Sequence, residues 1–201
     1  LQRNGFDFDL IDAHYYYPDG VAASFIAKAL GKPFVVTARG TDLNLIPEYE
    51  KPRKLILETA ERASASIGVC KALMDRLAEL GADPAKLHTL RNGVDLERFK
   101  PIDRKLARQR LGLAEDQPIY ISVGHLVERK GHHIAIEAMV RLSNSLLLIA
   151  GSGPESGRLQ QLATQLGVDD RVRFLGQIAN DQLNTWYSAA DALFLCSSRE
   201  G

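Results

Sequence analysis

The sequence predicts an α/β protein with two halves, each containing a parallel β-sheet. Short runs of apolar and β-branched residues alternate with helical stretches along almost the whole chain. Strands that alternate with helices of about 10–15 residues are typical of βαβ units, in which the strands are parallel. The alternation is interrupted once, near residue 100. These two observations predict the fold class.

The expected strands form two groups, one on each side of the interruption. Four runs before it and four after it have the composition of strands: 9–13, 33–37, 65–69, 86–90, 119–123, 145–150, 171–175 and 191–195. We expect each group to form one sheet, because successive βαβ units place their strands side by side.

The expected helices show apolar residues at spacings of three, four and seven, which place them on one helix face. Clear stripes lie at 73–80, 159–166 and 183–190. Gly31, Gly81 and Gly167 each follow an expected helix, where a left-handed glycine ends the helix cheaply. Asp181 is placed to cap the helix of the last stripe. These stripes predict core packing.

The segment around Pro101 predicts the boundary between the halves. Proline cannot extend the interior of a strand or helix, and a charged helical stretch, 104–111, follows it. We therefore divide the chain into two domains, 1–100 and 101–201.

Composition excludes several classes of protein. Lys plus Arg and Asp plus Glu both total 25, which argues against bulk electrostatic binding to nucleic acid or an acidic membrane. The apolar runs are strand-sized, too short to cross a bilayer, and no signal peptide is evident at Leu1. Cys70 and Cys196 are expected to be buried free thiols, which favours the cytoplasm.

Candidate binding residues follow the strands, because ligands of such sheets bind beyond the carboxyl ends of the strands. Gly124 follows 119–123 and leads to Arg129 and Lys130 just before a helix. A glycine-bearing turn, two cations and a helix start predict an anion site. The alternative is a solvated charged loop.

Gly151 and Gly153 follow 145–150, where glycine would let the backbone approach a ligand closely. A dinucleotide-binding turn is the rival interpretation. The next glycine, Gly157, lies one place too late for that motif, and Glu155 would repel phosphate. The pattern therefore disfavours nicotinamide binding.

Polar clusters also follow the strands of the first half. His14 ends one strand, and Arg39 and Asp42 follow another. A structural histidine and a local Arg39–Asp42 ion pair are alternatives to a binding role. Asn92 precedes a glycine, which by itself indicates a turn.

No metal site is expected. His132 and His133 are adjacent on a helix and point in different directions. Asp7 and Asp9 stand at the amino end of the first expected strand, at the edge of the sheet away from any ligand, and are interpreted as a solvated turn.

The ordered set of motifs resembles the retaining glycosyltransferases of family 4, also called group 1. The matching runs are 37–42, 92–95 with Phe99, 123–131, 148–154, 172–176, 190–191 and 197–201. They span almost the whole chain. The resemblance implies the GT-B fold, with two Rossmann-like domains: an acceptor-side domain represented by 1–100 and a donor nucleotide-sugar domain represented by 101–201, both truncated.

The resemblance also implies roles for residues of the second half. Gly124, Arg129 and Lys130 would hold the donor's diphosphate, and Gly176 and Gln177 would approach the base. Glu200 would be the first glutamate of the family's paired motif and contact the transferred sugar. The second glutamate would lie beyond Gly201, so the chain is expected to be an internal piece of a longer enzyme.

In the first half, Arg39 stands where many members of the family carry a histidine that contacts the donor sugar. His14 is expected to take up part of that role, so His14, Arg39 and Glu200 form the expected catalytic set. Asp42, Asn92, Gly151 and Gly153 are implied as further residues of the cleft.

The implied reaction moves a hexose from a nucleoside-diphosphate sugar to an acceptor hydroxyl with retention of configuration. Neither a metal nor another cofactor is expected. The partners would be the donor and a carbohydrate or lipid-linked acceptor, with no nucleic acid. The implied setting is polysaccharide biosynthesis in the cytoplasm or at the inner face of the membrane, reached through segments outside this chain.

Three alternatives stay open. The first is a sugar-nucleotide epimerase of similar shape, which would need paired acid and base groups that we do not find. The second is a non-catalytic nucleotide-binding module, because the fragment is expected to be inactive alone. The third concerns assembly: surface exposed at truncated ends would allow a homodimer.

Overall fold

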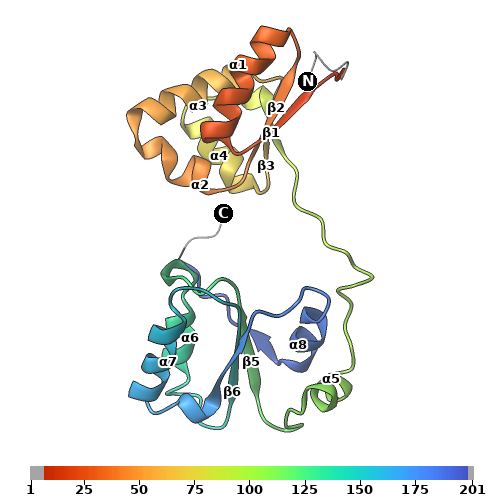
Figure 1. The fold of residues 1–201 in the computed structure, drawn as a ribbon, viewed down its shortest axis with the longest axis vertical. Helices are drawn as coiled ribbons and strands as arrows, with labels where there is room; N and C mark the ends of the chain where they lie inside the picture. The colour runs from red at the N-terminus through yellow and green to blue at the C-terminus, as the bar shows by residue number, and fades with distance from the viewer. Residues whose placement is uncertain (1–6, 199–201) are drawn as a thin grey trace. The chain divides into compact units, whose positions relative to one another are not determined.

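A computed structural model describes residues 7–198. It divides into two compact units, with the first ending at Gly93 and the second beginning at Val94. Each unit contains one sheet of four parallel strands (Figure 1). The chain is therefore an α/β protein with two parallel-sheet halves, as predicted.

The first unit has the strand order β1-β2-β3-β4. Its elements are β1 (Ile11–His14), η2 (Tyr16–Gly20), α1 (Val21–Leu30), β2 (Phe34–Ala38), α2 (Thr41–Asn44), η3 (Ile46–Glu48), α3 (Glu50–Arg62), β3 (Ala65–Gly68), α4 (Lys71–Glu79), η4 (Pro84–Lys86) and β4 (Leu87–Thr89). Sequential neighbours pair throughout, so every crossover in this sheet joins adjacent strands.

The second unit has the strand order β7-β6-β5-β8. Its elements are α5 (Arg104–Leu111), β5 (Ile119–Val123), η5 (Glu128–Lys130), α6 (His132–Ala138), β6 (Leu146–Ala150), α7 (Ser156–Gln165), η6 (Asp169–Arg171), β7 (Val172–Gly176), α8 (Leu183–Ala189) and β8 (Ala192–Leu193). The chain steps outward from β5 to β7 and returns to the other side at β8. The strand order therefore reverses at β5, a point where doubly wound sheets form a binding crevice.

Left-handed glycines follow the helices where the sequence predicts them. Gly31 and Gly167 adopt left-handed backbone conformations, with φ of 63° and 64°, directly after helical segments. The prediction for Asp181 is wrong. Gln182 occupies the position before α8, and no side chain caps this helix.

One face of the first sheet packs against helices. Ala13, Val36 and Ser66 lie in register on neighbouring strands and are buried, and Figure 1 shows α1, α3 and α4 on one side of the strands. The opposite face carries Asp12 and His14, which are exposed. A strand alternates its side chains, so these two residues, two positions apart, project from the same face.

The second sheet is covered on both faces, and each face has its own apolar cluster. One cluster joins β5 and β6 to α6 and α7, and the other joins the sheet to α5 and α8 (Figure 1). β6 is buried along its whole length, as expected for a central parallel strand. This packing fixes the carboxyl ends of β5 and β6.

A buried arginine fastens α5 to the sheet. Arg108 is 2% exposed, and its guanidinium donates to the carboxylate of Asp191 at 2.7 Å and to the carbonyl of Ala189 at 2.9 Å. Asp191 also accepts the N–H of Ile119 at 2.7 Å, at the start of β5. Partial burial alone would raise the pKa of Asp191, but this N–H and the cations of Arg108 and Arg104 lower it.

Candidate functional site

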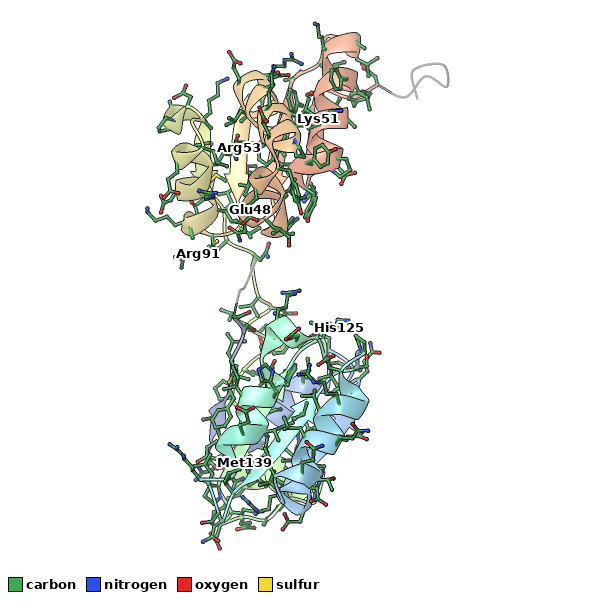
Figure 2. All side chains as sticks on the ribbon, turned by 90° about the vertical axis from the view of Figure 1, so that its left-hand side faces the viewer. Glu48, Lys51, Arg53, Arg91, His125 and Met139 are labelled. Atoms are coloured by element: carbon green, nitrogen blue, oxygen red, sulfur yellow. The ribbon has the colours of Figure 1, made fainter. Side chains whose placement is uncertain are left out.

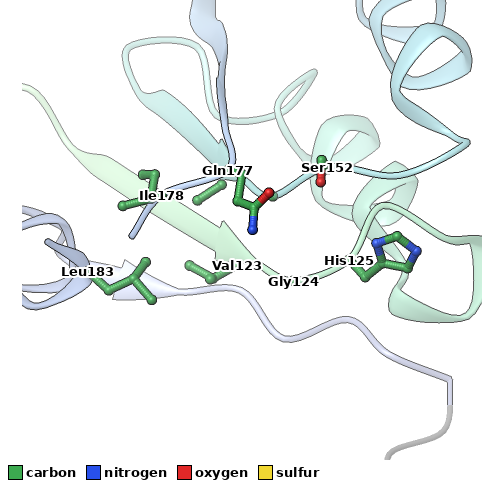
Figure 3. A pocket seen from close by; sticks show the side chains of 9 residues that line it. Val123, Gly124, His125, Ser152, Gln177, Ile178 and Leu183 are labelled. Carbon is green, nitrogen blue, oxygen red and sulfur yellow. The ribbon is translucent and has the colours of Figure 1, made fainter. Parts of the chain in front are cut away.

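A pocket of about 240 Å³ lies at the carboxyl ends of the strands in the second unit (Figure 3). Its walls come from the loops after β5, β6 and β7 and from the start of α8: Val123, Gly124, His125, Ala150, Gly151, Ser152, Gln177, Ile178 and Leu183. Three of the predicted site residues, Gly124, Gly151 and Gln177, meet here. The pocket stands where the strand order reverses, as the sheet topology predicts.

Two loops of this pocket touch backbone to backbone. A Cβ at Gly151 would overlap the carbonyl of Gly124, and one at Gly153 would overlap the backbone of Leu126. Leu126 donates its N–H to Ser152 at 2.9 Å, which holds the loops together. We predicted that these glycines would admit a ligand. The structure gives them a different close neighbour, the loop after β5.

The loop after β7 is tied to the same frame. Gly176 ends β7 with a left-handed φ of 69°, and its carbonyl accepts the N–H of Gly151 at 2.7 Å. Gln177 follows it and projects toward Gly124 over the end of β5 (Figure 3). Gly176 therefore positions Gln177, while Gln177 itself lines the pocket.

The two predicted cations lie on the short turn η5 and differ in their placement. The aliphatic stem of Lys130 runs beside Gly124, with its Cδ 3.9 Å from the position that a Cβ on Gly124 would take. Arg129 is exposed, and its carbonyl accepts the N–H of Ser198 at 3.0 Å. Neither side chain is part of the pocket wall, and Lys130 is the one that approaches Gly124.

His125 is a site residue that the sequence reasoning missed. It follows Gly124 directly and lines the pocket (Figure 3). Figure 2 shows it at the opposite end of the second unit from Met139. Its position immediately after the glycine of the turn was the available signal, but the two cations further along carry the stronger signal for an anion site.

His132 begins α6 and is 3% exposed. Its Nδ1 lies 2.9 Å from the Ser122 hydroxyl, and that hydroxyl lies 3.1 Å from the Phe194 carbonyl, to which it can donate. Burial lowers the pKa of His132, and the charges of Lys130 and His133 lower it further, while a hydrogen bond with the His125 backbone raises it. The sequence predicts no binding role for His132, because a metal pair with His133 is not expected.

The first unit gathers three predicted residues at the carboxyl edge of its own sheet. The Arg39 guanidinium donates to Nδ1 of His14 and, at 3.3 Å, to Oδ1 of Asn92. Nε2 of His14 lies 3.2 Å from the Asp12 carboxylate. Asn92, which the pattern indicated only as a turn residue, thus contacts Arg39. The cluster is polar and solvent-exposed, and it can offer hydrogen bonds to a ligand.

Asp42 is fully buried and acts through the backbone. Its carboxylate accepts the N–H groups of Tyr16 at 2.9 Å, Arg39 at 3.0 Å and Gly40 at 2.8 Å. The alternative that Asp42 pairs with the Arg39 guanidinium is wrong, because that guanidinium turns to His14 and Asn92. Asp42 instead fixes the backbone from which Arg39 projects.

The buried neighbour of Asp42 is a neutral tyrosine. Tyr16 is fully buried, and its hydroxyl donates to Ser66. Burial raises the pKa of Tyr16 to about 12, in spite of the Ser66 hydrogen bond and with help from the charge of Asp42. The phenol therefore serves as a hydrogen-bond donor in the core of the first unit.

Several other expectations meet the structure here. Glu200, the predicted sugar contact, lies outside the described residues. Both cysteines are free but half-buried, so the prediction of full burial is wrong, and burial raises the pKa of the Cys196 thiol.

Residues 7–198 contain no group of three His, Cys, Asp or Glu side chains placed to bind a metal. None of the helices described has the length and apolar character needed to cross a membrane.

Comparison with known proteins covers both units. Residues 103–201 match the family model of glycosyl transferases group 1, and residues 1–98 match that of glycosyltransferase family 4. The chain is 32% identical to the D-inositol 3-phosphate glycosyltransferase 1 of Catenulispora acidiphila, over 96% of this chain and 51% of that protein. It spans about half the length of the curated relatives it matches.

Solved structures share the fold. The Anabaena protein Alr3699/HepE in complex with UDP superposes with a TM-score of 0.85 at 24% identity, over 98% of this chain and 55% of that one. The sucrose-phosphate synthase of Thermosynechococcus elongatus gives 0.81 at 22% identity, over 99% and 53%. The two family models, which between them leave only residues 99–102 unmatched, and the GT-B fold of both units show that this chain belongs to the family 4, group 1 glycosyltransferases.

Proposed function

We propose that the whole protein transfers a hexose from a nucleoside-diphosphate sugar to an acceptor hydroxyl and retains the configuration at the sugar carbon. The observation that carries this proposal is the pocket lined by Gly124, Gly151 and Gln177, at the point where the strand order of the second sheet reverses. Related structures bind UDP and UDP-glucose in complexes of the same fold, which supports a nucleotide-sugar donor.

The base and the diphosphate would use different parts of this site. Gln177 and the backbone after Gly176 lie at the pocket wall, where a base can be contacted by hydrogen bonds. The backbone at Gly124, with Lys130 beside it and Arg129 on the same turn, would hold the diphosphate. Glycine permits close approach of the phosphates, and the cations oppose their charge.

The chemistry places its main demand on electrostatics. The bond between the sugar carbon and the diphosphate oxygen breaks, and the leaving diphosphate gains one negative charge. In the proposed course the acceptor attacks the same face of the sugar, and the leaving phosphate takes the proton of the acceptor hydroxyl. Fixed cations that oppose the developing charge lower the barrier, by several kcal/mol in typical enzymes.

The cluster of the first unit is assigned to the sugar and acceptor. Arg39 and His14 would contact sugar hydroxyls, because both present polar atoms from an exposed strand edge. Asn92 holds the Arg39 guanidinium from the side, and Asp12 accepts from the far nitrogen of His14. Glu200 is kept as a proposed sugar contact.

Calorimetric titration of the chain with UDP, GDP and ADP tests the donor assignment. We expect one nucleotide to bind and the double variant Arg129→Ala, Lys130→Ala to lose at least about ten-fold in affinity, since hydrogen bonds to charged groups are worth about 1.5–3 kcal/mol each. Chelation of metals with EDTA should leave binding unchanged, because these cations supply the charge.

The matched control removes two exposed cations elsewhere. Arg110 and Arg141 precede the amino ends of β5 and β6, at the opposite edge of the sheet from the pocket. The double variant Arg110→Ala, Arg141→Ala should bind as the original chain does. Equal losses in both double variants would contradict a local diphosphate site, as would a failure of all three nucleotides to bind.

Retention and the whole-protein activity need a transfer assay. The anomeric proton of the product, followed by NMR, should report the same configuration as the donor. The chain spans about half the length of its relatives, so we assign turnover to the whole protein. An equal rate from these 201 residues alone would overturn that assignment.

A further inference from the structure

The described part of the second unit leaves a buried ring nitrogen without a well-aligned hydrogen bond. Nε2 of His132 is fully covered, and no hydrogen bond of good geometry reaches it among the described residues. The backbone of His125 makes only a weaker hydrogen-bonding contact with the ring. The other ring nitrogen, Nδ1, is engaged with Ser122 at 2.9 Å. Buried polar atoms are nearly always paired, so an unpaired one at a sheet's binding edge indicates a missing ligand or proton.

The network around the ring defines which nitrogen carries hydrogen. The Ser122 hydroxyl has a single proton, and both contacts are used when it donates to the Phe194 carbonyl and accepts from Nδ1 of His132. Nδ1 then carries a hydrogen whether the ring is neutral or charged. Protonation therefore changes Nε2 alone, from a bare acceptor to a donor, and needs no rearrangement of Ser122.

This nitrogen faces the turn to which the diphosphate is assigned. The space beside the Cα of Gly124 is bounded by Nε2 of His132 at 3.7 Å, its Cε1 at 3.9 Å and Cδ of Lys130 at 3.9 Å, measured from the position of an added Cβ. Gly124 also lines the pocket. A glycine, a lysine stem and an unpaired imidazole nitrogen thus converge on one place.

Burial and the neighbouring charges favour the neutral form of the ring. Burial has the largest effect on the pKa of His132 and lowers it, and the charges of Lys130 and His133 lower it further, while a hydrogen bond with the His125 backbone raises it. A diphosphate beside Gly124 would bring negative charge close to the ring and reverse this balance. An uncharged Nε2, by contrast, would present its lone pair to an anion.

We propose that His132 belongs to the donor site and takes up one proton at Nε2 when a diphosphate binds beside Gly124. The charged ring then acts as a third cation, held in place by Ser122. This inference rests on the proposed function, since it needs a diphosphate in this site, and it adds a proton to the binding reaction. The proton comes from the solvent.

The linkage fixes the sign of the pH dependence. Between the lowered pKa of the free ring and its raised pKa in the complex, affinity rises as pH falls, by up to about ten-fold per pH unit for one proton. Below the first value both states are charged, and above the second both are neutral. Affinity is flat in those two ranges.

The experiment is calorimetry with UDP-glucose, in buffers of different ionisation enthalpy, from about pH 5.5 to about pH 8.5. Both phosphates of this probe are esterified, so the probe lacks the terminal phosphate group that titrates near pH 6. We expect net uptake of a proton around neutral pH. His132→Asn keeps a donor for Ser122 but removes Nε2, and it should bind without uptake and with a weaker pH dependence.

A matched variant separates His132 from its neighbour. His133→Asn should retain the proton uptake. Uptake that survives His132→Asn, or that disappears in His133→Asn, would overturn the proposal. Binding of the probe without any uptake would also overturn it while leaving the proposed function intact. Failure of the probe to bind would count against both.

A second measurement does not depend on the variant's stability. The Cε1 proton of His132 in the original chain can be followed by NMR during a pH titration. In the free chain its midpoint should lie below the ordinary pKa of histidine, and addition of the probe should move the midpoint above the free value. An unchanged midpoint in the complex would contradict proton uptake at this ring.

Discussion

Asp42 illustrates how a single buried carboxylate organises a surface cluster. It touches none of the groups that a ligand would meet, and its three partners are backbone N–H groups from two loops of the first unit. Sequence spacing could place Asp42 near Arg39, but it could not show that the carboxylate faces the backbone. That orientation depends on Tyr16, which lies 26 positions away along the chain.

Asp42→Asn should therefore loosen both loops. Asparagine offers one carbonyl oxygen in place of two carboxylate oxygens, and its amide group would face N–H donors. We expect a loss of about 2–4 kcal/mol in local stability, since buried donors are left unpaired. Hydrogen exchange at the amides of Tyr16, Arg39 and Gly40 measures it. Asp19→Asn, at an exposed position in the same region, is the control, and equal exchange in the two variants would contradict this role.

At the scale of the elements, the pocket of the second unit depends on a contact between two loops. The loop after β5 and the loop after β6 approach so closely that glycine is required at two positions of the latter. The sequence predicts that these glycines admit a ligand, whereas the structure places the backbone of another loop beside them. Sequence alone cannot distinguish the two causes, because each requires only that a Cβ be absent.

Gly153→Ala tests this contact. The added methyl group would overlap the backbone of Leu126, so the loops must separate, and we expect a loss of about 1–3 kcal/mol. Trp186, the single tryptophan, packs in the second unit and reports its unfolding in urea by fluorescence. Gly157→Ala is the matched control, because its Cβ would meet nothing within 4 Å and it lies in α7.

The control should move in the opposite direction. Alanine is favoured over glycine inside a helix by about 1 kcal/mol, so Gly157→Ala should stabilise the unit slightly. Similar unfolding midpoints for the two variants would show that Gly153 has more room than the contact indicates.

At the scale of the whole molecule, parallel α/β organisation could be predicted almost completely. Strand β5 has the predicted bounds, and β2, β6 and β7 differ by one residue at one or both ends. The signal was strong because buried parallel strands are continuous apolar runs. Asp181 failed because capping depends on where the chain turns, and the helix begins one residue later than Asp181 would require. Side-chain partners across the sheet, such as Asn92 and Arg39, had no local signal.

Arg108 and Asp191 connect the start of the second unit to its sheet, so their loss should lower the stability of the unit as a whole. Arg108→Met removes one donor of Asp191 and leaves several buried carbonyls without theirs. Asp191 keeps its contacts with Ile119 and Arg104, so we expect a cost of about 1–3 kcal/mol. The urea midpoint followed by Trp186 fluorescence measures it. Arg110→Met, on the exposed side of the same helix, is the control.

The same pair predicts a pH dependence. The pKa of Asp191 is lowered in the folded unit, so its ionised form adds stability above the ordinary pKa of aspartate, and this contribution is lost as pH falls through the folded value. The difference in urea midpoint between the original chain and Asp191→Asn should therefore shrink on going from neutral to strongly acidic solution. A difference independent of pH would contradict it.

The backbone contact between the loops after β5 and β6 has an evolutionary consequence. Main-chain atoms set the spacing of this frame, so it does not depend on which side chains stand at positions 125, 152 and 177. Descendants can exchange those side chains, and with them the ligand that the pocket prefers, while the frame persists. The glycines cannot be exchanged in this way, since a single methyl group at Gly151 or Gly153 would overlap the facing backbone and force the two loops apart.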